Sequence, residues 1–329
     1  MSVRALSTLL ASGVLLLAAH SSAYCQATSC DPSKALCARD AQSCLTTGLP
    51  LAWSSSCLQV YVQADGSPAQ GISFDAAKAS VTRAFDTWLA ADCGKAAPSL
   101  SVQVLGPIAC DASEYNPTQK NANIVVFRDK EWPYIGGEDA LGFTHLRFDP
   151  KTGELWDADI EINAVAEPYS IGEPVTGADL DSVLTHEAGH LLGLAHTLAK
   201  DATMFSSYTP GTDTLKTLAA DDVRAVCAVY SPERVPSRTS CAPRHGFSAA
   251  CGADQPENSA TNEGTDQEVT PADGNGSPAS KGCAMGFPQS QFPCWPSALL
   301  GAAAVGLILS RRRARRHQLV SCAGSARPR

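Results

Sequence analysis

The spacing of apolar residues along this 329-residue chain predicts both strands and helices in its middle part. Short apolar runs rich in β-branched residues are typical of strands, whereas apolar positions that recur every 3.6 residues are typical of helices. The pattern predicts an amphipathic helix over 74–91, with Ser73 or Asp75 as its cap. Its buried face carries Val81, Ala84, Phe85, Trp88 and Leu89. The predicted strands are 58–62, 100–105, 124–127 and 159–162.

A second helix is predicted over 179–192, and it carries the most informative residues of the chain. Its core-facing residues are Leu180, Val183, Leu184 and Leu191. His186 and His190 are four residues apart, so they lie on one face of this helix about 6 Å apart along its axis. Gly193 follows, and a glycine can take the left-handed conformation that ends a helix and reverses the chain. His196 would then approach the other two histidines from a different direction.

This segment matches the pattern HExxHxxGxxH at every fixed position. Three neutral imidazoles leave one tetrahedral position of a zinc ion open for water, which distinguishes a catalytic zinc site from a closed structural one. Glu187 adjoins the first histidine and is the expected general base for the zinc-activated water. The chemistry predicted from these residues is hydrolysis of a peptide bond.

Met204 lies eight residues beyond His196, in the stretch DATMFSSY. Together with the histidine motif, this stretch resembles the Met-turn of the metzincins, and of the matrixin family in particular. The segment 218–230 is similar to the C-terminal helix of that family, and the resemblance covers roughly residues 50–232. It implies an α+β fold, in which a twisted mixed β-sheet packs on helices and the active-site helix lies below the sheet.

The resemblance also implies roles for further residues. Met204 would form an apolar floor beneath the histidines, and Tyr208 would line a specificity pocket. The segments 140–145 and 153–163 look like the family's strands above the cleft, where an edge strand pairs with an extended peptide or protein substrate.

Asp157 and Asp159 are candidates for a calcium ion, with solvated strand-end carboxylates as the alternative. His145 is expected to be an ordinary surface or strand histidine. The family's PRCGxPD inhibitory motif does not occur in the sequence.

Both ends of the chain differ in character from its middle. Arg4, the apolar run 9–19 and Ser21-Ser22-Ala23 have the form of a secretory signal with cleavage after Ala23. The alternative, a membrane anchor, is disfavoured because the run is short. Near the other end, an apolar stretch over 292–310 precedes the arginine cluster 311–316, which favours a cytoplasmic end.

With Cys283 just upstream, this end resembles the C-terminal sorting domain of surface proteins in myxobacteria, and Cys283 is then a candidate attachment position. A plain single-pass anchor is the alternative. The predicted organisation is a signal peptide over 1–23, a Cys-rich segment over 24–49, a catalytic domain over 50–235, a disordered linker over 236–282, a sorting or transmembrane segment over 283–316 and a cytoplasmic tail over 317–329.

Cysteine usage and charge narrow the class of protein further. Thirteen cysteines indicate an oxidising compartment, and ten of them lie in the presumed exported part, which would allow five disulfides. The alternative for the cluster over 25–57 is a second metal site, but it contains no CxxC spacing. Without the seven arginines after Ser310, the chain has 18 basic and 33 acidic residues, a formal charge of −15 that argues against nucleic acid.

The sequence therefore predicts an exported zinc endopeptidase, retained at the cell surface or outer membrane through its C-terminal tail or secreted after processing. The first competing hypothesis is a surface binding module that keeps the zinc for shape alone, and the presence of Glu187 argues against it. The second is a thermolysin-type peptidase whose third ligand is a distant glutamate, and His196 argues against that.

Overall fold

The computed structural model describes residues 24–31, 35–113, 115, 121–134, 137 and 139–242, together with the short strand Cys283–Met285. The predicted signal peptide, most of the predicted linker, and the predicted C-terminal segments apart from Cys283–Met285 lie outside the described residues. The helices are η1 (Pro68–Gln70), α1 (Phe74–Leu89), α2 (Leu180–Leu191), η2 (Thr214–Lys216) and α3 (Ala220–Val229). The strands are β1 (Cys25–Gln26), β2 (Cys57–Gln63), β3 (Ser101–Ile108), β4 (Asn123–Phe127), β5 (Gly142–Phe148), β6 (Leu155–Ile162), β7 (Tyr169–Ser170), β8 (Ala178–Asp179), β9 (Leu194–Ala195) and β10 (Cys283–Met285).

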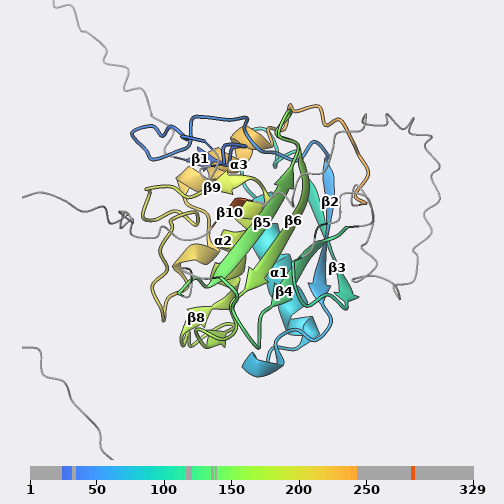
Figure 1. The fold of residues 1–329 in the computed structure, drawn as a ribbon, viewed down its shortest axis with the longest axis vertical. Helices are drawn as coiled ribbons and strands as arrows, with labels where there is room; N and C mark the ends of the chain where they lie inside the picture. The colour runs from blue at the N-terminus through green and yellow to red at the C-terminus, as the bar shows by residue number, and fades with distance from the viewer. Residues whose placement is uncertain are drawn as a thin grey trace, which may run out of the picture. The chain divides into compact units, whose positions relative to one another are not determined.

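The main sheet is mixed and has the strand order β10-β5-β6-β4-β2-β3. β2 is parallel to both of its neighbours, and β4 is parallel to β6. β5 is antiparallel to β6, and β10 pairs antiparallel with the other edge of β5. Figure 1 shows the long strands β5 and β6 side by side, with α1 passing behind them. The arrangement confirms the predicted α+β class with a mixed sheet.

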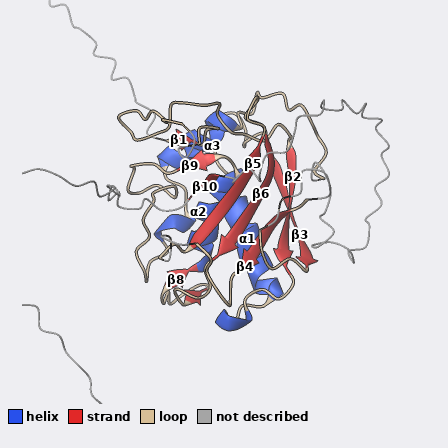
Figure 2. Cartoon of the chain, in the orientation of Figure 1, coloured by secondary structure: helices blue, strands red, loops and turns tan. Residues whose placement is uncertain are grey.

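One face of this sheet packs on the helices. Val60 of β2, Val125 of β4 and Ile160 of β6 share the main core with residues of α1 and α2. Because successive strand residues point to opposite faces, their neighbours lie on the other side of the sheet. There a smaller core is formed by Tyr61, Ile108, Cys110, Ala122, Ile124 and Val126. Figure 2 shows the resulting helix layer behind the strands.

The predicted elements are present with small differences in length. α1 begins at Phe74 as expected, and Ser73 is its N-cap because its side chain accepts a hydrogen bond from the N–H of Ala76. The largest difference is β6, which starts at Leu155, whereas the hydrophobic pattern predicts a strand only from Asp159 and the family resemblance indicates one within 153–163. Asp157, Asp159 and Glu161 alternate with apolar residues here and are all buried. Because charged residues are not counted as buried positions in a hydrophobic pattern, the first half of the strand does not stand out in the sequence.

Four disulfides join the described cysteines, namely Cys25–Cys44, Cys30–Cys37, Cys57–Cys241 and Cys93–Cys227. Cys110 is disulfide-bonded as well. The expectation of disulfides, rather than a metal site among the cysteines over 25–57, is therefore confirmed. Cys241 also changes the boundary of the packed region. Its bond to Cys57, and the hydrogen bond from the N–H of Ser56 to the carbonyl of Arg238, hold residues 236–242 against the domain although the sequence assigns them to the linker.

No helix among the described residues has the length and apolar character needed to cross a membrane. The apolar stretch 292–310, on which the predicted C-terminal span rests, lies outside those residues.

Trp88 links the two central helices. Its side chain is fully buried, and its Nε1–H donates to the carbonyl of Thr185 in α2 at 2.7 Å. We expect Trp88→Ala to lower the free energy of unfolding by about 3–5 kcal/mol, since it removes a large core side chain and leaves a cavity between α1 and α2. Val235→Ala, at a side chain that is 90% exposed, should change it by less than about 0.5 kcal/mol. Urea unfolding of both variants measures the difference, and equal stabilities would contradict this account of the core.

Candidate metal centre

Helix α2 is buried along almost its whole length and presents its polar residues into the interior. Asp179 caps it, because the side chain accepts the N–H of Ser182 at 2.7 Å. His186, Glu187 and His190 are 3%, 2% and 0% exposed. Buried polar side chains are stable only with partners, so each of these three needs an interaction that replaces water.

The chain reverses at Gly193, as the sequence predicts. Gly193 has φ +86°, and a Cβ atom on it would lie 2.6 Å from the carbonyl oxygen of Leu51. A side chain is therefore excluded both by backbone conformation and by the close approach of another segment. The turn ends α2 directly after the second histidine and sends the chain back as β9, which leads into His196.

The last carbonyls of α2, which have no partner within the helix, are satisfied by distant segments. Trp53 Nε1–H donates to the carbonyl of Leu191 and the Tyr230 hydroxyl donates to that of Leu192, both at 2.8 Å. The N–H of Ala27 donates to the carbonyl of Gly193, also at 2.8 Å. Residues before β2 and after α3 thus fix the turn that positions the third histidine.

The Cys-rich N-terminal segment takes part in this arrangement. β1 pairs antiparallel with β9, so that Cys25 lies opposite Ala195 and Gln26 opposite Leu194. The disulfide Cys25–Cys44 ties this strand to the rest of its segment. The segment over 24–49 therefore packs on the loop that carries His196.

The three histidines of the motif converge. The Nε2 atom of His196 lies 3.2 Å from that of His186 and 3.1 Å from that of His190. The ligand atoms of all three residues lie within 4.8 Å of one another, and among the described residues this is the one group of three side chains that could hold a metal ion. The structure brings together every histidine that the motif predicts.

Hydrogen bonds fix which ring nitrogens can bind a cation. Nδ1 of His186 lies 2.6 Å from the carbonyl oxygen of Thr203, and Nδ1 of His190 lies 2.9 Å from that of Leu194. A carbonyl oxygen only accepts, so both Nδ1 atoms carry the proton and both Nε2 atoms point a lone pair toward His196. These lone pairs are available to a cation that binds between the three rings. The site therefore fits a metal ion held by imidazole nitrogens, the ligand set that suits zinc.

Burial keeps these rings neutral, which is the form that binds metal. Desolvation lowers the pKa of His186 to about 4, against a weaker opposing effect of its bond to Thr203. Desolvation and the nearby His186 lower the pKa of His196 to about 3, and burial lowers that of His190 well below its usual value.

Glu187 lies between α2 and β5. Its Oε2 atom accepts a hydrogen bond from the Thr144 hydroxyl at 2.7 Å, and a Cβ atom on Gly142 would lie 2.8 Å from its Oε1 atom. Burial raises the pKa of Glu187 to about 8, and the bond from Thr144 opposes that rise. A divalent cation beside the carboxyl would also oppose it, because opposite charge favours the ionised form.

The turn containing Met204 lies behind the histidines. Met204 is buried, and a Cβ atom on Gly189 would lie 2.3 Å from its sulfur, so the thioether packs directly on α2 between the two helical histidines. The carboxylate of Asp222 accepts the N–H groups of Thr203 and Met204 and thereby fixes the turn. The carbonyl of the same Thr203 then orients His186.

Tyr208, the predicted pocket wall, is tied to the start of α2. Its hydroxyl accepts the N–H of Asp179 at 2.8 Å and donates to the carbonyl of Thr212. The loop after Met204 is thus held to the active-site helix by a side chain.

The candidate calcium residues are buried on the outer face of β6. Asp159 accepts the N–H of Ile124 at 3.1 Å with one oxygen and the Ser113 hydroxyl at 3.0 Å with the other. Asp157 lies opposite Arg147 in the strand register. His145 lies on the neighbouring strand, where its Nε2 shares a hydrogen bond with the Tyr134 hydroxyl at 2.7 Å. Asp157 and Asp159 are therefore not solvated strand-end carboxylates, and calcium binding stays a prediction.

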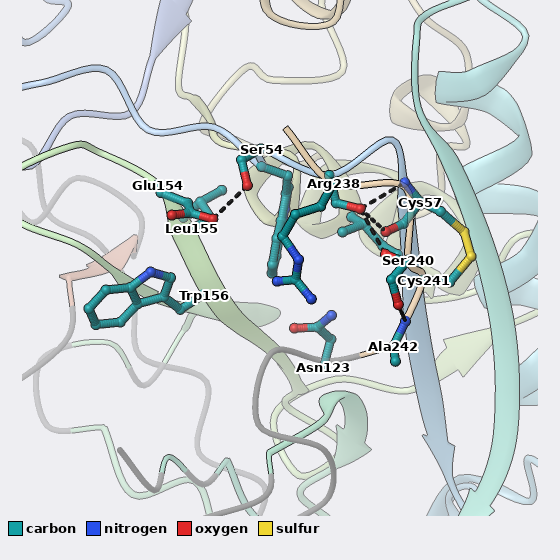
Figure 3. Close-up of a pocket in the computed structure, with 13 residues that line it drawn as sticks. Ser54, Cys57, Asn123, Glu154, Leu155, Trp156, Arg238, Ser240, Cys241 and Ala242 are labelled. Carbon is teal, nitrogen blue, oxygen red and sulfur yellow. Dashed lines mark hydrogen bonds between the residues drawn. A yellow bond between two sulfur atoms is a disulfide. The ribbon is translucent and has the colours of Figure 1, made fainter. Parts of the chain in front are cut away.

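A small cavity lies where β2 and β6 begin, beside the Cys57–Cys241 disulfide (Figure 3). Its polar lining includes Ser54, Asn123, Glu154 and Arg238. The volume is about 20 Å³, which has room for about one water molecule. It is too small for an organic ligand.

Sequence reasoning missed the residues that support the motif, namely Gly142, Thr144, Thr203 and Asp222. Only Asp222 left a signal, as one of two adjacent acids at the start of an apolar helix segment. Thr144 and Gly142 lie more than 40 residues before Glu187 in the sequence, and only the packing of β5 on α2 brings them to it.

This combination of mixed sheet, histidine-bearing helix, glycine turn and methionine turn is that of a metzincin catalytic domain. Residues 103–231 match the family model described as Matrixin, so this part of the chain is similar to a matrixin catalytic domain.

Curated relatives agree with that class. The chain is 32% identical over 163 residues to "Metalloendoproteinase 1" of Glycine max, which is 47% of this chain and 46% of that protein. It is 47% identical over 96 residues to "Metalloendoproteinase 5-MMP" of Arabidopsis thaliana, covering 28% of this chain and 26% of that one. The match to "Matrix metalloproteinase-20" of Homo sapiens is 37% over 70 residues, or 21% and 14% of the two chains. The chain thus spans less than half the length of these relatives.

The neutral histidines make the metal-free protein sensitive to acid. Their folded-state pKa values lie below 6.5, so the unfolded chain takes up protons first as the pH falls. The contribution of these histidines to the free energy of unfolding is therefore complete above about pH 6.5 and is lost as the pH falls below that value. Each group contributes up to about 1.4 kcal/mol per pH unit. We expect the unfolding free energy of metal-free protein, measured with urea from about pH 7 to pH 4, to fall less steeply in His196→Ala. Identical slopes would contradict the buried, neutral triad.

Proposed function

We propose that this protein is an exported zinc endopeptidase that hydrolyses peptide bonds of extracellular proteins. The observation that supports this most strongly is the convergence of three neutral imidazoles, two of them on the helix that also carries the buried carboxylate of Glu187. A site that served only for structure would have no use for Glu187, because three ligands and a nearby base are what a hydrolytic centre requires.

His186, His190 and His196 would hold the zinc through their Nε2 atoms. When bound, the ion supplies Lewis acidity, which makes a water molecule more acidic and polarises the carbonyl of the scissile bond. The contribution of the protein is to keep the rings neutral and correctly rotated, through burial and through the carbonyls of Thr203 and Leu194. Hydrogen bonds of this kind fix the orientation and the tautomer of histidines that bind a metal.

Glu187 would move the proton. Its carboxylate accepts a proton from the attacking water and later passes it to the amine of the leaving group. The carboxylate adjoins His186 in sequence and lies under β5, so both the water and the scissile bond would have to sit between the histidines and that strand.

The substrate would bind as an extended strand on the edge of β5. Antiparallel pairing of β10 with this edge, with Met285 opposite Thr144, supports the proposal, because it places a peptide strand beside the residue that contacts Glu187. A substrate strand there would take the place of β10. Backbone pairing of this kind selects for extended conformation rather than for a particular sequence.

Export is supported by the disulfides, which persist in oxidising compartments. The signal peptide over 1–23 is part of the same proposal. Surface attachment through the tail over 283–316 is proposed from the sequence resemblance.

The decisive test is the loss of one proton acceptor. Glu187→Gln keeps the size of the side chain and all three histidines, so we expect it to retain about one zinc per chain while peptide hydrolysis falls at least about a hundredfold. Casein cleavage measures activity, and atomic absorption of the purified full chain measures zinc. Equal cleavage by both proteins would refute the role of Glu187, whereas zinc-loaded wild type that cleaves nothing would favour a binding module.

A further inference from the structure

Two residues of β5 form the immediate surroundings of Glu187. Thr144 is fully buried and faces α2, whereas its neighbours Phe143 and His145 point to the other side of the sheet. The Thr144 hydroxyl lies 2.7 Å from Oε2 of Glu187 and 3.2 Å from the backbone carbonyl oxygen of the same residue. The sheet therefore places a hydrogen-bond donor directly on the proposed base.

From this geometry we infer that Thr144 is a positioning residue for Glu187: its hydroxyl anchors Oε2, so that Oε1 is the oxygen that exchanges the proton during hydrolysis. This inference rests on the proposed peptidase function. It assigns Thr144 an action through Glu187 and no contact with the reacting atoms.

A hydroxyl group has a single proton to donate, and the shorter distance to Oε2 makes that oxygen its acceptor. Hydrogen bonds to ionised groups are the strong ones in a buried site. Among the residues that the structure describes, no other side chain donates to this carboxylate. Without Thr144 the carboxylate would be free to rotate about its terminal bond.

The two oxygens of Glu187 have different surroundings because residue 142 is a glycine. A Cβ atom there would lie 2.8 Å from Oε1 and 2.9 Å from Cγ, which is closer than real Cβ contacts. Because Gly142 has no side chain, the Glu187 side chain can pack directly against β5. Oε2 is held by the Thr144 hydroxyl, whereas Oε1 lies against the backbone of Gly142.

The position of Thr144 is itself fixed. In the sheet it pairs with Ile160 of β6, a fully buried residue of the main core. The donor therefore belongs to a central part of the fold rather than to a loop, which is what precise positioning of a catalytic group requires.

Three variants of the full chain test the inference. Thr144→Val has nearly the same shape and no donor, so we expect kcat to fall about ten- to a hundredfold with KM within about twofold. Thr144→Ser keeps the hydroxyl and should restore kcat to within about threefold of wild type. Thr82→Val removes a hydroxyl that bonds only to its own helix, at Lys78, and should match wild type.

Two further measurements separate positioning from a structural effect. Zinc content should remain at one per chain in all variants, and crystal structures should show Glu187 in one orientation in wild type and Thr144→Ser but rotated or spread in Thr144→Val. Wild-type kcat in Thr144→Val, failure of Thr144→Ser to restore it, or an unmoved Glu187 would overturn the inference. If wild type is inactive, or equals Glu187→Gln, the proposed function fails and the inference falls with it.

Discussion

The constraint on which the site depends is the reversal of the chain at the end of α2. The helix can supply two histidines on one face, but the third has to return from the opposite direction within six residues. Gly193 makes this possible with its left-handed backbone and its close contact with Leu51. The reversal is stable because the carbonyls it exposes accept hydrogen bonds from Trp53, Tyr230 and Ala27, three positions far apart in the sequence. The arrangement of the three histidines is thus a property of the whole domain, including the N-terminal segment that pairs with β9.

A second layer of backbone contacts connects metal binding to the fold. Asp222 of α3 holds the turn at Thr203 and Met204, the carbonyl of Thr203 orients His186, and Met204 packs on Gly189. On the other side of α2, β5 supplies Thr144 and Gly142 to Glu187. Two of the three histidines and the base therefore belong to one helix, yet the groups that orient them come from β5 on one side and from the turn held by α3 on the other.

Much of this site could be predicted from the sequence, because its central residues are local. The 3.6-residue period gave α1 and α2, and the spacing of His186, His190, Gly193 and His196 gave the cluster with its turn. The supporting contacts could not be predicted, since Thr144, Trp53 and Tyr230 reach α2 only through long-range packing. The hydrophobic pattern marks only the second half of β6 as a strand, because three acids alternate with its apolar residues. These acids are stable in the sheet because Ser113, before β4, and Tyr134, after β4, donate hydrogen bonds to Asp159 and Glu161. Disulfide pairing depends on the same long-range proximity, as the bond between Cys57 and Cys241 illustrates.

The central claim is that three imidazoles and one exchangeable solvent oxygen surround a single zinc ion. X-ray absorption at the zinc edge of the purified full chain tests it most directly, because scattering distinguishes nitrogen and oxygen neighbours from sulfur. We expect about four light neighbours with the multiple-scattering signal of about three imidazoles. A sulfur neighbour in active protein, fewer than three imidazoles, or the absence of bound zinc would contradict it.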